Sequence, residues 1–190
     1  MSRIPKWIIL LLAFLLTANG FLYTAFADND DHQKKRRYEK RERKHSERDD
    51  KRNLTIVNNL AYTENCGACH FAYQPGLLPS DSWDKILNGL ADHFGEDIDL
   101  DPESKKIIVK YLKANAANYS SVKLSVKIMR SLGHQTPLRI AEVPYIQREH
   151  HEIKVNVFKR ESIGSLSNCL ACHTTAEKGI YDDDSVKIPK

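Results

Sequence analysis

All four cysteines of this 190-residue chain fall into two copies of one short pattern. The letters "CGACH" occupy residues 66–70, and "CLACH" occupies residues 169–173. In both copies two residues separate the cysteines, and a histidine follows at once. A disulfide across so short a loop gains little from chain entropy, and zinc-binding histidines are usually not adjacent to the cysteine pair. The repeated pattern therefore constrains the fold more than any other feature of the sequence.

The C-x-x-C-H pattern attaches c-type haem. Each thiol adds across one vinyl group of the haem, and the histidine that follows binds the iron as its proximal ligand. A thioredoxin-like C-x-x-C would need a βαβ context, which the flanking residues do not show. We therefore predict two covalently bound haem c groups. The predicted anchors and proximal ligands are Cys66, Cys69 and His70 for the first haem and Cys169, Cys172 and His173 for the second.

The last axial position of each iron decides what the haem can do. A methionine there raises the potential, a second histidine lowers it, and an open position allows ligand chemistry. Met129 is the one methionine after the N-terminal apolar run, so at most one haem could have a His/Met pair. Histidines are more plentiful. Of His150 and His151 we expect one to bind iron and the other to face solvent, and we expect His134 in a turn.

His93 is the best placed of the candidate distal ligands. Residues 81–94, "DSWDKILNGLADHF", repeat apolar residues at helical spacing. We expect a helix here, with Ser80 as its N-cap and Gly95 after its last turn. On that helix His93 would share the inward face with Ile86.

Three further helices are expected, and the chain after them is rich in loops. Residues 54–62 predict a short helix that leads into the first anchor. Residues 102–117 predict a strong helix, capped by Asp101, and residues 121–132 predict a weaker one. The side chains expected on the buried faces are Ile107, Ile108, Tyr111 and Leu112 in the former and Val122, Val126 and Met129 in the latter. The sequence therefore predicts a mainly α fold, with a first haem domain at 54–120 and a loop-rich second haem segment at 121–190.

The N-terminal quarter of the chain has the character of a targeting segment followed by a tether. Residues 1–27 combine an early basic charge, an apolar run and small residues, which is typical of a secretory signal peptide. An uncleaved membrane anchor is the alternative. Residues 28–53 carry 11 Lys and Arg against 8 Asp and Glu, and we expect a charged disordered tether, or one that is partly helical. A role toward acidic lipid or an acidic partner is the alternative for this tether. We expect a periplasmic protein, held at the inner membrane if the signal stays uncleaved.

The chain resembles the dihaem cytochrome c family, the periplasmic electron donors of the sphaeroides haem protein, from about residue 58 to 189. The resemblance rests on an ordered set of segments. They are "NCGACH", "LLPSDSW", "HFGED", "IIVKYLKANAA", "TPLRIAEVPYIQREH", "NCLACHTTAEKGIYDDD" and the closing "KIP".

This resemblance implies a small helical domain, similar to class I cytochrome c, followed by a second haem segment with little regular structure. It implies haems of low potential with two histidine ligands each. The family's distal histidines match His93 and His150, and His150 fits the family pattern better than His151. The resemblance favours His93 for the first haem and His150 for the second, and leaves the opposite pairing open.

The function that follows is an exported carrier of single electrons and not an enzyme. The resemblance implies two kinds of partner: a small oxygen-binding monohaem cytochrome of the sphaeroides haem protein type, and a membrane b-type cytochrome or quinol system as the electron source. No nucleic-acid partner is expected for an exported protein. The main alternative is a haem enzyme, a peroxidase or ligand-reducing protein, with one open iron site; another is a subunit or sensor of a larger complex.

Overall fold

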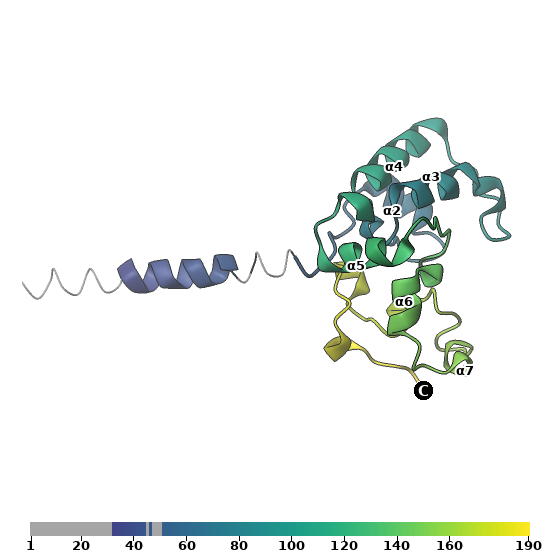
Figure 1. The fold of residues 1–190 in the computed structure, drawn as a ribbon. Helices are drawn as coiled ribbons and strands as arrows, with labels where there is room; N and C mark the ends of the chain where they lie inside the picture. The colour runs from purple at the N-terminus through teal and green to yellow at the C-terminus, as the bar shows by residue number, and fades with distance from the viewer. Residues whose placement is uncertain (1–31, 45, 47–50) are drawn as a thin grey trace, which may run out of the picture. The chain divides into compact units, whose positions relative to one another are not determined.

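The computed structural model describes residues 32–44, 46 and 51–190. They belong to two compact units, of which the first ends at Glu47 and the second begins at Arg48. In the first unit, residues 32–44 form a helix whose side chains are all exposed (Figure 1). No helix among the described residues is both long and apolar enough to cross a membrane. The predicted signal peptide at 1–27 lies outside the described residues.

The second unit, here called the body, is built from short helices joined by turns and loops (Figure 1). Its described residues contain no β-strand, which confirms the prediction of a mainly α fold. After α6 only α7, 3₁₀ turns and loops remain. The α-helices are α2 Leu60–Cys66, α3 Ser80–Asn88, α4 Pro102–Ala114, α5 Lys123–Leu132, α6 Pro144–Glu149 and α7 Val155–Phe158.

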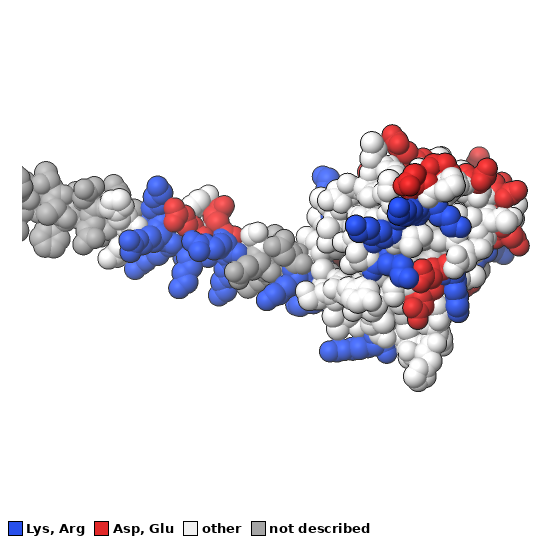
Figure 2. All heavy atoms as spheres, turned by 90° about the horizontal axis from the view of Figure 1, so that it is seen from above, with Lys and Arg blue, Asp and Glu red and all other residues white. Residues whose placement is uncertain are grey.

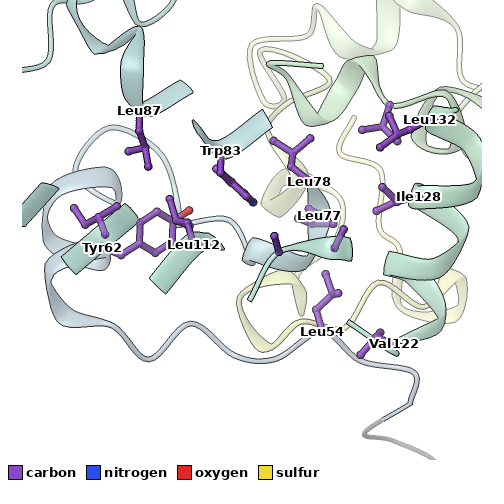
Figure 3. Close-up of a cluster of buried hydrophobic side chains, with 14 of the residues drawn as sticks. Leu54, Tyr62, Leu77, Leu78, Trp83, Leu87, Leu112, Val122, Ile128 and Leu132 are labelled. Carbon is purple, nitrogen blue, oxygen red and sulfur yellow. The ribbon is translucent and has the colours of Figure 1, made fainter. Parts of the chain in front are cut away.

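One hydrophobic cluster unites the helices α2 to α6. Figure 3 shows Tyr62 of α2, Leu112 of α4 and Ile128 of α5 among its members. Leu77 and Leu78, which lie in and just after the 3₁₀ helix η1 Pro75–Leu77, belong to the same cluster and are almost completely buried. Burial of large aliphatic side chains contributes roughly 1.5–3 kcal/mol each, so this cluster fixes how the helices pack.

The segment 74–80 runs through the interior, with every residue buried. Side chains of α3 and α5 donate hydrogen bonds to two of its backbone carbonyls, since buried carbonyls need partners. The indole nitrogen of Trp83 donates to Pro75 O at 2.9 Å, and the Ser125 hydroxyl donates to Gly76 O at 2.8 Å. Gly76 is needed here because a Cβ would lie 2.9 Å from both the Leu54 and Ser125 side chains.

The C-terminal segment closes back onto the start of the body. The amide of Leu54 donates to Gly179 O at 2.9 Å. Gly179 has φ +72°, and a Cβ there would meet Leu54 O at 2.0 Å, so the position accepts only glycine. The Tyr181 hydroxyl donates to Gln74 Oε1 at 2.6 Å, and the Gln74 amide donates to Ala176 O at 2.6 Å.

The helix predicted at 54–62 is wrong in its position. The chain from Leu54 to Asn58 has no regular structure, and α2 begins at Leu60. Asn59 is the N-cap, and its side chain accepts from the Tyr62 amide. The amide of Leu54 instead pairs with Gly179 O, a contact that no local pattern reveals.

The helix predicted at 81–94 is too long. The helix α3 ends at Asn88, with Gly89 as its C-cap, and the 3₁₀ helix η2 Leu90–Asp92 follows. Ser80 is the first helical residue, and Pro79 is the N-cap. Gly95 lies in a tight turn with φ +99° and does not end a helix. Glycine interrupts the helix six residues earlier than expected because it lowers helix stability wherever it occurs.

The next two predicted helices are confirmed, with shifted ends and faces. Asp101 caps α4 by accepting from the Ser104 amide at 2.9 Å, as predicted. The helix stops at Ala114 instead of 117 because the Ala117 amide turns to pair with Leu78 O. In α4, Ile108 and Leu112 are buried and Tyr111 is partly buried, as expected, but Ile107 is 46% exposed.

The buried face of α5 differs from the prediction by about one residue. The helix starts at Lys123, with Val122 as its buried N-cap residue. Val126 and Met129 are only half-buried, because the hydrogen bond from Ser125 to Gly76 O turns Ser125 inward. The fully buried residues of the helix are Ser125, Ile128 and Leu132.

Candidate haem sites

The first C-x-x-C-H pattern straddles the end of α2. Cys66 is the last helical residue, and the turn after it carries Cys69 and His70. Gly67 makes the turn possible, because its amide donates to Thr63 O at 2.9 Å and a Cβ would come within 2.3 Å of that oxygen. Cys66 is partly buried, and Cys69 and His70 are exposed.

The His70 ring is oriented by a backbone carbonyl. Its Nδ1 lies 2.9 Å from Phe71 O, and since a carbonyl can only accept, Nδ1 carries the proton. The lone pair of the neutral ring is therefore on Nε2. This is the arrangement in which a histidine binds metal while its other nitrogen is held by an outer partner.

His93 faces His70 from a turn and not from a helix. The His93 amide donates to Glu96 O at 2.7 Å, and the Glu96 amide returns a bond to His93 O at 3.3 Å. Phe94 takes φ +59° inside this turn. Its ring lies 3.8 Å beneath the guanidinium carbon of Arg139, which ties the turn to the second half of the body. The ring centres of His70 and His93 are 6.4 Å apart and their planes differ by 29°.

The second pattern lies in the 3₁₀ helix η5 Cys169–Ala171 and the two residues after it. The His173 amide donates to Cys169 O at 2.7 Å, which folds the two cysteines and the histidine into one turn. Asn168 holds this turn in place by donating to Ile163 O at 2.9 Å. Cys169, Cys172 and His173 are all partly buried, whereas Cys69 and His70 of the first pattern are exposed.

His150, at the end of α6, faces His173 with ring centres 6.0 Å apart and planes at 69°. Its Nδ1 donates to Ile146 O at 2.7 Å, so its Nε2 also carries the lone pair. His151 does not join this pair. Its side chain is 68% exposed, and its Nε2 lies 4.0 Å from Glu152 Oε1.

In both sites, the distance between the two histidine rings fits a metal ion held between them, with one imidazole on either side. A metal–imidazole bond is roughly 2 Å long and the ring centre lies roughly 1 Å farther, so two opposed ligands have centres about 6 Å apart. Both observed separations, 6.4 Å and 6.0 Å, match this value. In the described part of the chain, no three His, Cys, Asp or Glu side chains gather to hold a metal ion by themselves.

A cavity of about 360 Å³ adjoins the second pattern, which is within the range of cofactor sites. Its wall is mainly apolar, with Ile146, Phe158 and Leu166 among the lining residues beside His150 and His173. The Nδ1 of His173 is buried and has no hydrogen-bond partner among the described residues. A buried polar nitrogen left alone costs about 1–3 kcal/mol. The residues present therefore fit an apolar group with a metal at its centre.

The electrostatics of both sites favour neutral rings and thiols. Burial lowers the pKa of His93, and the nearby His70 and Arg139 lower it further. Burial also lowers the pKa of His173, with His150 adding to the effect and Asp183 opposing it. Burial raises the pKa of Cys66 and of Cys169 to about 11. A neutral imidazole is the form that binds iron.

A buried connection between the two patterns escaped the sequence analysis. Tyr73 packs against His70 with ring centres 4.9 Å apart, and Tyr181 packs against His173 at 5.5 Å. Gln74 follows Tyr73 in the chain and accepts the Tyr181 hydroxyl at 2.6 Å. The signal in the sequence was the uncharged run 71–80, "FAYQPGLLPS", but its partners lie a hundred residues away and cannot be found from spacing.

Comparisons with known proteins show which proteins this chain is similar to. The chain matches the family model "Dihaem cytochrome c" over residues 62–181. It is similar in structure to a dihaem cytochrome c from Rhodobacter sphaeroides, with 41% identity, a TM-score of 0.58, and coverage of 67% of this chain and 99% of that one. A dihaem c-type cytochrome from Shewanella baltica is 37% identical, with a TM-score of 0.57 and coverage of 70% and 95%. Among curated proteins no match was found.

Proposed function

Because this chain belongs to the dihaem cytochrome c family, and so carries two covalently bound haem c groups, we propose that it is an exported one-electron carrier with two histidine ligands on each iron. The proposed pairs are His70 with His93 and His150 with His173. When bound, haem c supplies reversible one-electron oxidation and reduction at its iron. The observation that carries the proposal is the placement of one histidine opposite each C-x-x-C-H histidine, at 6.4 Å and 6.0 Å.

The chain's own groups orient the proposed ligands. Phe71 O and Ile146 O each accept a hydrogen bond from the Nδ1–H of their histidine, which fixes the ring and raises the basicity of Nε2. The turn that holds His93 is anchored through Phe94 to Arg139. If these four histidines bind the two irons in pairs, neither iron would keep a position for a substrate, and the absence of a methionine ligand would give a low potential. Met129 instead packs against the hydrophobic core from α5.

The proposed partners are those of the family. The acceptor is a small oxygen-binding monohaem cytochrome of the sphaeroides haem protein type, and the donor is a membrane b-type cytochrome or quinol system. The two sites offer different access to such partners, because Cys69 and His70 are exposed whereas Cys169, Cys172 and His173 are not. The first site is therefore the proposed point of electron exchange with an external protein. The proposed location is the periplasm, where c-type cytochromes of this family act.

Low-temperature magnetic resonance of the oxidised protein tests the ligand assignment. We expect two low-spin haem signals in the oxidised, unaltered protein, and no change in the absorption spectrum of the reduced protein when carbon monoxide is added. His93→Ala and His150→Ala should each remove one low-spin signal and give one haem that binds carbon monoxide once the protein is reduced. His151→Ala is the matched control and should leave both signals intact, since its side chain is exposed. Carbon monoxide binding by the unaltered protein, or a lost signal only in His151→Ala, would overturn the proposal.

A further inference from the structure

The helix at 32–44 carries charge far in excess of what a solvent-exposed spacer needs. It contains eight Lys and Arg and two Glu, and every one of its side chains is exposed. Figure 2 shows blue side chains along much of this helix, with little red. The body from residue 54 onward contains 16 Lys and Arg and 17 Asp and Glu, so the positive charge of the protein is concentrated in the N-terminal segment.

Helical geometry sorts these charges onto two faces. At about 100° per residue, seven of the eight bases fall within one continuous arc of about 180° that contains no acid. Glu39 and Glu42 lie on the opposite side, together with Tyr38 and Lys35. We call the seven-base arc the basic face. Its residues are Lys34, Arg36, Arg37, Lys40, Arg41, Arg43 and Lys44.

This sorting does not stabilise the helix by itself. Bases four residues apart repel one another, and the basic face contains such pairs at Arg36 and Lys40, Lys40 and Lys44, and Arg37 and Arg41. A spacer helix stabilised by its own ion pairs would place a glutamate four residues before most of its bases, whereas in 32–44 this spacing occurs only between Glu39 and Arg43. The basic face therefore indicates an external anion that neutralises it.

An anionic lipid surface matches the basic face better than a protein does. Protein interfaces have a core rich in aromatic and apolar side chains and depleted in lysine, whereas the basic face has no apolar residue and Tyr38 points the other way. Lipid headgroups need only clustered charge, and polybasic segments next to a membrane-directed apolar run bind them. Such a run, "WIILLLAFLL" at 7–16, precedes the helix in the sequence.

We propose that the basic face binds the anionic headgroups of a membrane and so keeps the body at the membrane surface. The inference rests on the export given under the proposed function, and it deepens that function by keeping the carrier beside a membrane donor. It does not depend on how the irons are ligated. The helix binds through charge, so the attachment weakens with salt and is reversible.

The test compares binding of the haem-loaded protein, its N-terminus established by mass spectrometry, to two kinds of vesicle. One contains phosphatidylglycerol mixed with phosphatidylcholine, and the other contains phosphatidylcholine alone. The measured quantity is the ratio of the two partition coefficients, which isolates the electrostatic part even if the apolar run is retained. We expect a ratio well above one at low salt that falls toward one at high salt.

Two variants examine the face itself. The exchange E39K/K40E keeps composition and net charge but puts an acid in the middle of the basic face. The pair Lys40→Gln and Lys44→Gln removes two bases with a residue that forms helix well. Each base near an anionic surface contributes about 1 kcal/mol of binding free energy. Each of the two variants should therefore lower the ratio of partition coefficients by ~30-fold.

The matched control is the exchange E103K/K106E on α4, where the two side chains are 78% and 79% exposed and form an ion pair within one turn. It should leave the ratio unchanged. All variants should keep the haem spectrum of the unaltered protein, so a failure here is separate from a failure of the ligand assignment. A ratio near one for the unaltered protein overturns the proposal. An equal fall of the ratio in E39K/K40E and in the control E103K/K106E also overturns it. An unchanged ratio in E39K/K40E and in the double Gln variant also overturns it, and leaves an acidic protein as the partner to seek.

Discussion

At the scale of single residues, the body is closed by a small number of close contacts between its start and its C-terminal segment. Gly179 brings its carbonyl to the Leu54 amide, and the missing side chain is what allows the approach. Two residues later, Tyr181 reaches Gln74 from the same segment. These contacts place His173 and its cavity against the interior segment 74–80.

Two glycine variants separate two effects on stability: the close approach of Gly179 to Leu54, and the left-handed backbone conformation that Gly179 shares with Gly164. Gly179 and Gly164 both have positive φ, +72° and +81°, but a Cβ at Gly164 meets nothing within 4 Å. Gly164→Ala should lower the free energy of unfolding by about 1–2 kcal/mol for the left-handed backbone alone. Gly179→Ala should cost more, about 3–5 kcal/mol, because it also breaks the pairing with Leu54. Urea unfolding followed by circular dichroism measures both, and equal losses would contradict the role of the Leu54 contact.

At the scale of elements, the helices are short, so their ends matter as much as their faces. The helix α2 has only seven residues, and its last residue is Cys66. A helix of this length is not stable alone. Its cap and its packing against α4 therefore determine where the first anchor lies.

The cap of α2 can be removed without touching the haem site. The Asn59 side chain accepts from the Tyr62 amide at 2.9 Å, so Asn59→Ala should lower the free energy of unfolding by about 1 kcal/mol. The neighbour Asn58 is exposed and is the control, and Asn58→Ala should change the stability by less than about 0.5 kcal/mol. Chemical unfolding monitored by far-UV circular dichroism gives both values. A larger effect at Asn58 than at Asn59 would refute the capping role.

Local signals predicted the elements to a limited extent. The Asp101–Pro102 pair correctly marked the start of α4, because a cap and a first-turn proline act within the helix itself. Gly95 misled the prediction of α3, since Gly89 had already ended that helix. The structure nevertheless brings His93 opposite His70, although the helical position that suggested it was wrong.

What the sequence could not provide were the contacts between distant segments. Leu54 with Gly179, Gln74 with Tyr181, and Phe94 with Arg139 each join residues that no periodic pattern relates. The C-x-x-C-H patterns were readable because covalent chemistry requires fixed spacing. Neither the assignment of His150 over His151 nor the partial burial of the second site follows from spacing, since both depend on how α6 packs.

At the scale of the whole molecule, the haem groups complete the core. The cavity of about 360 Å³ at the second site is mainly apolar and would be unfilled in a haem-free chain. Its apolar lining, which includes Ile146, Phe158 and Leu166, would face water in a haem-free chain, and the burial of such side chains contributes roughly 1.5–3 kcal/mol each. The loss of several such contributions is a large part of the stability of a small domain.

Removal of the cysteine anchors should therefore destabilise the body, and the two pairs of anchors should differ in how much they contribute. Replacing all four cysteines by serine should abolish a cooperative thermal transition. Replacing Cys169 and Cys172 alone should destabilise more than replacing Cys66 and Cys69 alone, because Cys169, Cys172 and His173 are all partly buried whereas Cys69 and His70 are exposed. Calorimetry of the three variants decides the order. A cooperative native-like transition in the fourfold variant would contradict this dependence on haem.

The pairing of Leu54 with Gly179 also sets the order of maturation. A polypeptide leaving the ribosome or a translocon presents Cys66 and Cys69 more than a hundred residues before Gly179 emerges. The first porphyrin can be attached before Gly179 has emerged, but the final tertiary closure must wait for that residue. The first half can thus receive its haem early without reaching its final packing, and a truncation that removes Gly179 would leave an attached but open precursor.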